Sequence, residues 1–219
     1  VNLYNNQACY FHVNEALRRE FVKSNQVWQP HERAVMRLVS VGTSDMKGMD
    51  VILKTASLLK ENFKGCFEWT VFGKVPNLRY LKAITGIEAL EVNVHFVGNG
   101  TADDILAALL DTDIYVHAAY AENSPNSICE AQMMGVPIIT TNAGGIVSLF
   151  DKQYDLSMLA PINDPYYLAS KIIQLVEDKE LCIKLGKINW NISRLRNSDE
   201  NIRKETINAY NSILISQNA

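Results

Sequence analysis

The chain has 219 residues, of which 47% are hydrophobic and 21% are charged. This length and composition fit one large soluble domain, or at most two small ones, with enough apolar side chains for a core. The net charge of −3 argues against a nucleic-acid-binding protein, which usually carries a basic face, so no nucleic-acid partner is expected. No segment reaches the ~18–20 apolar residues that a bilayer-crossing helix needs.

The cysteines and the chain start indicate the compartment. Cys9, Cys66, Cys129 and Cys182 lie far apart without a CxxC pair, so free or buried thiols in a reducing compartment are expected rather than a zinc site. The N-terminus lacks the basic start and apolar run of a signal peptide, and it does not begin with methionine. We therefore expect a piece of a longer protein.

Residues 1–35 show little strand periodicity and are interpreted as connecting structure. Within them, Asn14 to Val22 predicts a short amphipathic helix with Asn14 as its N-cap. Gln26 to Glu32 predicts a linker.

From residue 36, short apolar runs alternate with longer helical patterns. Short continuous apolar runs are typical of strands buried on both faces, as in a parallel sheet. The predicted strands are 36–41, 69–72, 94–97, 114–116, 136–140 and a weaker 156–160. This alternation predicts right-handed βαβ units, and therefore an α/β fold with a doubly wound, Rossmann-like parallel sheet of about six strands and flanking helices.

The helical patterns lie between and after these strands. Thr101 and Asp104 have the spacing of a capping box and open one of the helices. The predicted helices are 50–62, 77–88, 101–110, 166–178, 179–197 and 199–217. We assign residues 36–180 to the core domain and 181–219 to C-terminal helices that pack on it or reach towards another domain.

Ligands of open α/β sheets bind at the carboxyl ends of strands, near the point where the strand order reverses. The loop after the first strand carries Lys47 and leads into a helix, which suits an anion. A glycine-punctuated turn with a solvated lysine is an equal alternative. The loop that begins at Gly98 starts like a dinucleotide fingerprint, but Asp103 replaces the third glycine, so a nicotinamide or flavin site is rejected. A tight turn whose backbone lines a base explains it better.

The helix predicted after Ser124 is the stronger phosphate element. Pro125 suits its first position, where no N–H is needed. The helix dipole would attract an anion to the free amides of this turn. These amides belong to Asn126, Ser127 and Ile128. The alternatives are that Ser124 or Ser127 caps the helix, or that Glu130 reaches back to the Ser127 amide as a capping box.

These motifs resemble glycosyltransferase family 4, also called group 1, whose members are retaining enzymes of GT-B architecture. The resemblance is carried by VGTSDMKGMDVILKTASLLK and by FVGNGTADDILAALLDTDIYVHAAYAENSPNSICEAQMMGVPIITT with the following NAGGI. It runs from about Val39 to Val176 and implies the C-terminal, donor-binding domain. Its most specific part is an E-x7-E motif, Glu122 to Glu130, before a Gly-x-Pro strand. YFHVNEALRREF looks like the end of the acceptor domain, or the crossover to it, and places residues 1–35 there.

The resemblance implies roles for the motif residues. It places Glu122 beside the donor sugar and Glu130 on the ribose hydroxyls, which a carboxylate accepts through charge-assisted hydrogen bonds. The amides of Asn126 and Ser127 would hold the diphosphate, and Lys47 would neutralise the leaving diphosphate. Glu122 and Lys47 are therefore the predicted catalytic residues.

Further donor-binding residues are predicted in the strand-end loops. They are Gly42, Thr43, Gly98, Gly144 and Gly145. Gly144 and Gly145 permit close approach of the backbone to the sugar, with a plain turn as the alternative. Thr43 stands where many relatives have an arginine. Either the donor is held with fewer charges, by Lys47 with Lys74 as a helper, or another base substitutes for the arginine. His117 stands where relatives often have proline, and both a site role and a structural role stay open.

The resulting hypothesis is sugar transfer from a nucleoside-diphosphate sugar to an acceptor hydroxyl with retained configuration, in surface or capsular polysaccharide biosynthesis. No DxD-like cluster lies near the loops, so neither a metal nor any cofactor beyond the donor is expected. The sugar or lipid-linked acceptor would bind through a missing N-terminal domain, and this fragment alone would be inactive. The resemblance also implies a cytoplasmic enzyme, with peripheral association at the inner membrane face. The alternatives are a nucleotide-sugar epimerase of the same architecture and a non-catalytic nucleotide-binding module.

Overall fold

The computed structural model describes residues 11–217, which form an α/β domain around a six-stranded sheet. The strand order is β3-β2-β1-β4-β5-β6, and every neighbouring pair is parallel. The strands are β1 Val35–Val41, β2 Cys66–Phe72, β3 Val94–Gly98, β4 Ile114–His117, β5 Ile138–Thr141 and β6 Leu159–Ala160. The predicted doubly wound fold is confirmed.

The central strands match their sequence pattern because they are buried on both faces. Every residue of β4 and β5 is buried. The β2 strand begins three residues before the predicted start, at Cys66, where exposed and buried side chains alternate and no continuous apolar run exists. The weak sixth strand is mostly wrong, because Leu156–Met158 forms a 3₁₀ turn in which Asp155 accepts a hydrogen bond from the Ser157 amide at 3.0 Å.

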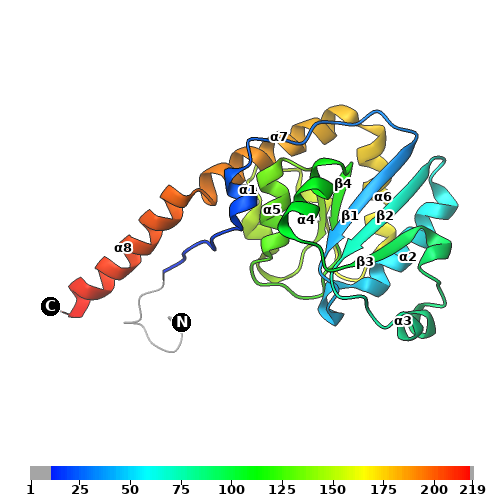
Figure 1. The fold of residues 1–219 in the computed structure, drawn as a ribbon, viewed down its shortest axis with the longest axis horizontal. Helices are drawn as coiled ribbons and strands as arrows, with labels where there is room; N and C mark the ends of the chain where they lie inside the picture. The colour runs from blue at the N-terminus through cyan, green and yellow to red at the C-terminus, as the bar shows by residue number, and fades with distance from the viewer. Residues whose placement is uncertain (1–10, 218–219) are drawn as a thin grey trace.

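Helices cover both faces of the sheet, and one helix extends away from it (Figure 1). The helices are α1 Arg19–Lys23, α2 Met49–Asn62, α3 Leu78–Thr85, α4 Ala102–Leu110, α5 Asn126–Met134, α6 Pro165–Glu177, α7 Lys179–Arg196 and α8 Asp199–Gln217. On one face α2 packs against α6, while α1, α4 and α5 lie together on the other. The Thr101–Asp104 capping box is present as predicted. Within residues 11–217, none of the helices is long and apolar enough to cross a bilayer.

The first helix is shorter than predicted, and Asn14 does not cap it. The α1 helix spans only Arg19–Lys23, after Arg18. The backbone N and the Nδ2 atom of Asn14 instead donate to the Glu205 carboxylate, at 3.2 and 3.1 Å. A distant charged partner therefore takes the side chain that would otherwise have capped the helix, and the prediction for this segment is wrong.

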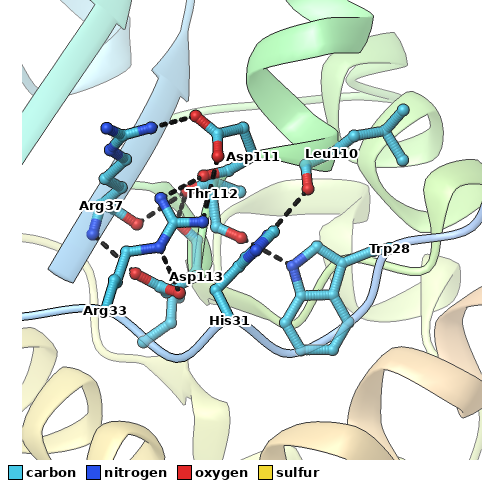
Figure 2. A network of polar contacts seen from close by, with 9 residues as sticks. Trp28, His31, Arg33, Arg37, Leu110, Asp111, Thr112 and Asp113 are labelled. Carbon is cyan, nitrogen blue, oxygen red and sulfur yellow. Dashed lines mark hydrogen bonds and ion pairs between the residues drawn. The ribbon is translucent and has the colours of Figure 1, made fainter.

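The segment between α1 and β1 packs on the domain. Trp28 is only 5% exposed, its backbone N donates to the Met134 carbonyl at 2.8 Å, and its Nε1 donates to the Thr112 carbonyl at 2.6 Å. Figure 2 shows the ion pair in which Arg33 Nη2 lies 3.0 Å from Asp111 Oδ1. These contacts attach the segment between α1 and β1 to the end of α5 and to the turn before β4.

Helix α7 is hydrogen-bonded to α5 through a buried serine and a partly buried arginine. Ser193 donates to the Cys129 carbonyl at 3.1 Å, and Arg196 Nη2 donates to Gln132 Oε1 at 2.6 Å. Because these particular groups are hydrogen-bonded to one another, they can be removed from solvent without a large penalty. The three cysteines in the described part of the chain, Cys66, Cys129 and Cys182, are free thiols, as expected, and Cys9 lies outside it.

The loops after β1 and β4 touch at the point where the strand order reverses. The Tyr120 amide donates to the Met46 carbonyl at 2.8 Å. Gly48 has a φ of +67°, and a Cβ atom placed on it would lie 2.0 Å from the Ala118 carbonyl oxygen. Only glycine therefore allows the two loops to approach this closely.

We expect Gly48→Ala to destabilise the domain by roughly 3 kcal/mol or more, because it combines a left-handed backbone with a backbone clash. Gly86→Ala is the matched control, since Gly86 has a φ of +73° and no atom within 4 Å of an added Cβ. It should cost only about 1 kcal/mol, for the left-handed conformation alone. Urea unfolding of both variants measures the difference, and equal losses would contradict the loop contact.

Candidate functional site

The residues predicted to bind a ligand gather at the carboxyl end of the sheet. The strand order reverses between β1 and β4, which are neighbours although β2 and β3 intervene in sequence. A crevice at such a switch point is the usual ligand site of open α/β sheets. Lys47 follows β1 and Glu122 follows β4, so the topology places both of them at this point.

Glu122 is the centre of a charged cluster. Its Oε1 atom accepts a hydrogen bond from Lys47 Nζ and lies 3.0 Å from His117 Nε2. The Glu122 side chain is 11% exposed, and that of His117 is 3% exposed. The structure therefore brings the two predicted catalytic residues together as an ion pair. It also gives His117, whose role the sequence left open, a direct contact with Glu122.

The ionisation of this cluster follows from burial and from its hydrogen bonds. Burial opposes the charged form of Glu122, but the contacts with His117 and Lys47 outweigh it, and the pKa of Glu122 falls to about 2. Burial lowers the pKa of His117 below its ordinary value. The ring is therefore neutral near pH 7, and its Nε2–H can donate to Glu122. At neutral pH Glu122 is therefore an ionised hydrogen-bond acceptor.

The start of α5 differs from the prediction by one residue. Pro125 is not the first helical residue, because it is extended, with φ −73° and ψ 108°, and the helix begins at Asn126. The Ile128 amide donates to the Pro125 carbonyl at 3.0 Å, so it is not a free donor. Asn126 and Ser127 lie in the first turn, whose amides have no preceding helical carbonyl. No side chain caps this end, so the serine-cap alternatives are wrong.

Glu130 is buried and bound by an arginine that the sequence did not single out. Arg18 Nε donates to Glu130 Oε1, and Arg18 Nη2 donates to Oε2, each at 2.7 Å. The capping box in which Glu130 would reach the Ser127 amide is therefore wrong. The two partners are 112 residues apart, so no local pattern could have revealed the pair.

The loop after β5, which contains Gly144 and Gly145, packs against the backbone at the start of the E-x7-E motif. An added Cβ on Gly144 would lie 2.0 Å from the Glu122 carbonyl oxygen, and one on Gly145 would lie 2.1 Å from that of Asn123. The Gly145 amide also donates to the Glu122 carbonyl at 3.2 Å. These glycines are needed for close packing on the Glu122 backbone. Their contact with a sugar stays a prediction.

The remaining predicted residues lie at the end of β3 and in the loops after β1 and β2. Gly42 and Gly98 have left-handed backbones, with φ of +100° and +84°. Thr43 donates through its hydroxyl to the Lys74 carbonyl at 2.5 Å. Lys74 is exposed and, with Thr43, lines a cavity of about 640 Å³ between α2 and α3. Among residues 11–217, no three His, Cys, Asp or Glu side chains are grouped so that they could hold a metal ion.

A doubly wound sheet with a lysine, a carboxylate and a helix start at its switch point is the arrangement at which open α/β sheets commonly bind a ligand. The model of the family described as "Glycosyl transferases group 1" matches residues 29–190, which is more than half of the chain. The chain therefore belongs to the group 1 glycosyltransferases.

A relative in sequence agrees with this family, and solved structures share the fold. The amylovoran biosynthesis glycosyltransferase AmsK of Erwinia amylovora is 28% identical in an alignment of 147 positions that covers 64% of this chain and 36% of AmsK. TarM of S. aureus, solved with fondaparinux, α-GlcNAc-glycerol and UDP, has a TM-score of 0.74 at 17% identity, over 96% of this chain and 41% of TarM. HepE of Anabaena, solved with UDP and glucose, has a TM-score of 0.70 at 17% identity, over 82% of this chain and 49% of HepE. The chain thus spans about a third of its curated relative and less than half of either structure.

We expect the stability that Glu122 contributes to depend on pH. Its pKa falls from 4.5 to about 2 on folding, so this contribution is complete above about pH 4.5 and is lost as the pH falls towards 2. Glu122→Gln should therefore cost about 1–2 kcal/mol at pH 7, allowing for solvent screening, and progressively less below pH 4.5. Urea unfolding between pH 3 and 7 measures the difference from the wild type. Glu61→Gln, at an exposed position, is the control, and a difference that does not change with pH would contradict the assignment.

Proposed function

We propose that the chain is the donor-binding domain of a retaining glycosyltransferase of family 4. The enzyme would move a sugar from a nucleoside-diphosphate sugar to an acceptor hydroxyl. The observation that carries the proposal is the ion pair of Lys47 with Glu122 at the switch point, four residues before α5 begins. These groups match the parts of such a donor, because they combine a cation, an ionised carboxylate and helix amides.

Each part of the donor has a complementary group in the domain. The amides of Asn126 and Ser127 point from the positive end of α5 and would bind the diphosphate, together with Lys47. Glu130 would accept the two ribose hydroxyls, and Glu122 would accept hydroxyls of the sugar. HepE and TarM were both crystallised with UDP, which makes uridine diphosphate the first nucleotide to test.

The chemistry follows from where charge develops. As the glycosidic bond to the diphosphate breaks, negative charge grows on the leaving phosphate and positive charge grows on the sugar ring. Lys47 and the helix amides would stabilise the first of these charges. The low pKa of Glu122 keeps it ionised, so it would stabilise the sugar as a charged acceptor and would not protonate the leaving group.

The acceptor half of the reaction would come from outside these 219 residues. The chain covers 49% of HepE and 41% of TarM, so it would bind nucleotide and catalyse no transfer by itself. The name of AmsK supports a role in polysaccharide biosynthesis. We infer a sugar or lipid-linked acceptor and a cytoplasmic enzyme, associated peripherally with the inner membrane face.

We expect the chain to bind UDP and Glu130→Ala to weaken that binding by about tenfold or more, because two charge-assisted hydrogen bonds are lost. Isothermal titration calorimetry measures both affinities, and circular dichroism checks that the variant is folded. Glu61→Ala is the control, because Glu61 is exposed at the C-terminal end of α2, and this variant should bind UDP as the wild type does. Failure of UDP and of every other nucleoside diphosphate to bind would refute the proposed site.

In the complete enzyme, we expect Lys47→Ala and Glu122→Ala each to lower kcat by about 10²–10³-fold, since each removes charge stabilisation of the transition state. Lys47→Arg should retain part of the activity because it keeps the charge. Turnover with a nucleotide-sugar donor is the measurement. Unchanged kcat in either alanine variant would rule out the roles assigned to these residues.

A further inference from the structure

The carboxylate of Glu130 is already occupied by a group of the same chain. Both of its oxygens accept a hydrogen bond from Arg18, in a two-point geometry with each distance at 2.7 Å. Within residues 11–217, no other group is hydrogen-bonded to this carboxylate. The Glu130 side chain is 4% exposed whereas that of Arg18 is 39% exposed, so the guanidinium lies between the carboxylate and solvent.

A guanidinium and a ribose diol make the same demand on a carboxylate. Each presents two adjacent donors that match its two oxygens. A diol that bound Glu130 would therefore have to take the place of Arg18. Because the Arg18 side chain is 39% exposed, its guanidinium is already partly hydrated and can turn into solvent when it leaves Glu130.

We propose that Arg18 occupies the ribose position of the nucleotide-free protein and competes with the vicinal diol of the nucleotide, so that it sets the affinity of the donor site. This inference rests on the proposed function, in which Glu130 is the ribose anchor. The competitor comes from the segment that precedes α1, and the anchor lies on α5. Nucleotide binding at Glu130 and the ion pair between this segment and α5 therefore exclude each other.

The surroundings of Arg18 allow its side chain to leave while its backbone stays. Arg194 donates to the carbonyls of Val22 and Ser24, and Asn197 Nδ2 donates to the Glu15 carbonyl at 3.3 Å. These contacts, made by α7 and by the residue after it, fix the segment on both sides of Arg18. The exchange thus needs rotation of one long side chain and no movement of α1.

Phe21 supports the guanidinium from one side. The Arg18 Cζ atom lies 4.9 Å from the centroid of the Phe21 ring, which is fully buried. This cation–π contact does not use the N–H groups that bind Glu130. The contact can therefore keep the Arg18 guanidinium near the site whether or not Arg18 is bound to Glu130.

Calorimetric titration of UDP and of 2′,3′-dideoxyuridine diphosphate into Arg18→Met tests the proposal. We expect Arg18→Met to bind UDP about tenfold more tightly than the wild type, a change equivalent to about 1.4 kcal/mol. The dideoxy analogue lacks the diol, so its affinity should not change. Arg19→Gln is the matched control, because Arg19 is the adjacent exposed arginine, and it should bind both nucleotides as the wild type does.

A measurement on the wild type avoids any dependence on the folding of the variant. The ¹⁵N resonance of Arg18 Nε should report a hydrogen-bonded proton in the free protein. The signal of this hydrogen-bonded proton should be lost on saturation with UDP and kept on saturation with the dideoxy analogue.

The outcomes separate this inference from the proposed function. Equal or weaker UDP binding by Arg18→Met, or an Arg18 signal that UDP does not change, overturns the competition. If UDP still binds the wild type and Glu130→Ala weakens that binding by about tenfold or more, the proposed function stands. Absence of UDP binding in both the wild type and Arg18→Met overturns both.

Discussion

The contact between the loops after β1 and β4 is the constraint on which the site depends. Gly48 lies against the Ala118 carbonyl, and this contact holds Lys47 beside Glu122. From the other side, Gly144 packs on the carbonyl of Glu122 itself. The carboxylate is thus fixed by backbone contacts on two sides and ionised by its partners. Such a preformed charge needs little reorganisation when a ligand arrives.

The second half of the site depends on how α5 is held. The N-terminal end of α5 has no side-chain cap and follows the loop after β4, whereas polar side chains of α7 are hydrogen-bonded to the same helix. Ser193 and Arg196 therefore stabilise the position of a helix whose first amides stay available. Glu130, on this helix, takes its charge partner from the segment before α1. The helix thus links the N-terminal segment, the C-terminal helices and the candidate donor site.

Local sequence patterns predicted the fold and the position of Lys47 and Glu122. Continuous apolar runs such as β4 and β5 identify buried strands, and residues directly after them must lie at one edge of a parallel sheet. The failures involve partners distant in sequence. Asn14 was expected to cap a helix but binds Glu205, 191 residues away. Glu130 had a possible local partner in the Ser127 amide but binds Arg18. Local propensity cannot rank a nearby partner against a charged one that only the tertiary fold supplies.

The pairing of β1 with β4 also has a consequence for how the molecule folds. Leu38 lies opposite Ile114, so the pair closes a loop of 76 residues, counted as 114 minus 38. No tight turn can nucleate this pairing. The entropy of closing the loop is lost before the contacts between the two strands form and stabilise the pair. The candidate site exists only on chains that have completed this step. A nucleotide that binds there would draw the folding equilibrium towards the native state by mass action, while leaving the search for the β1–β4 register as slow as before.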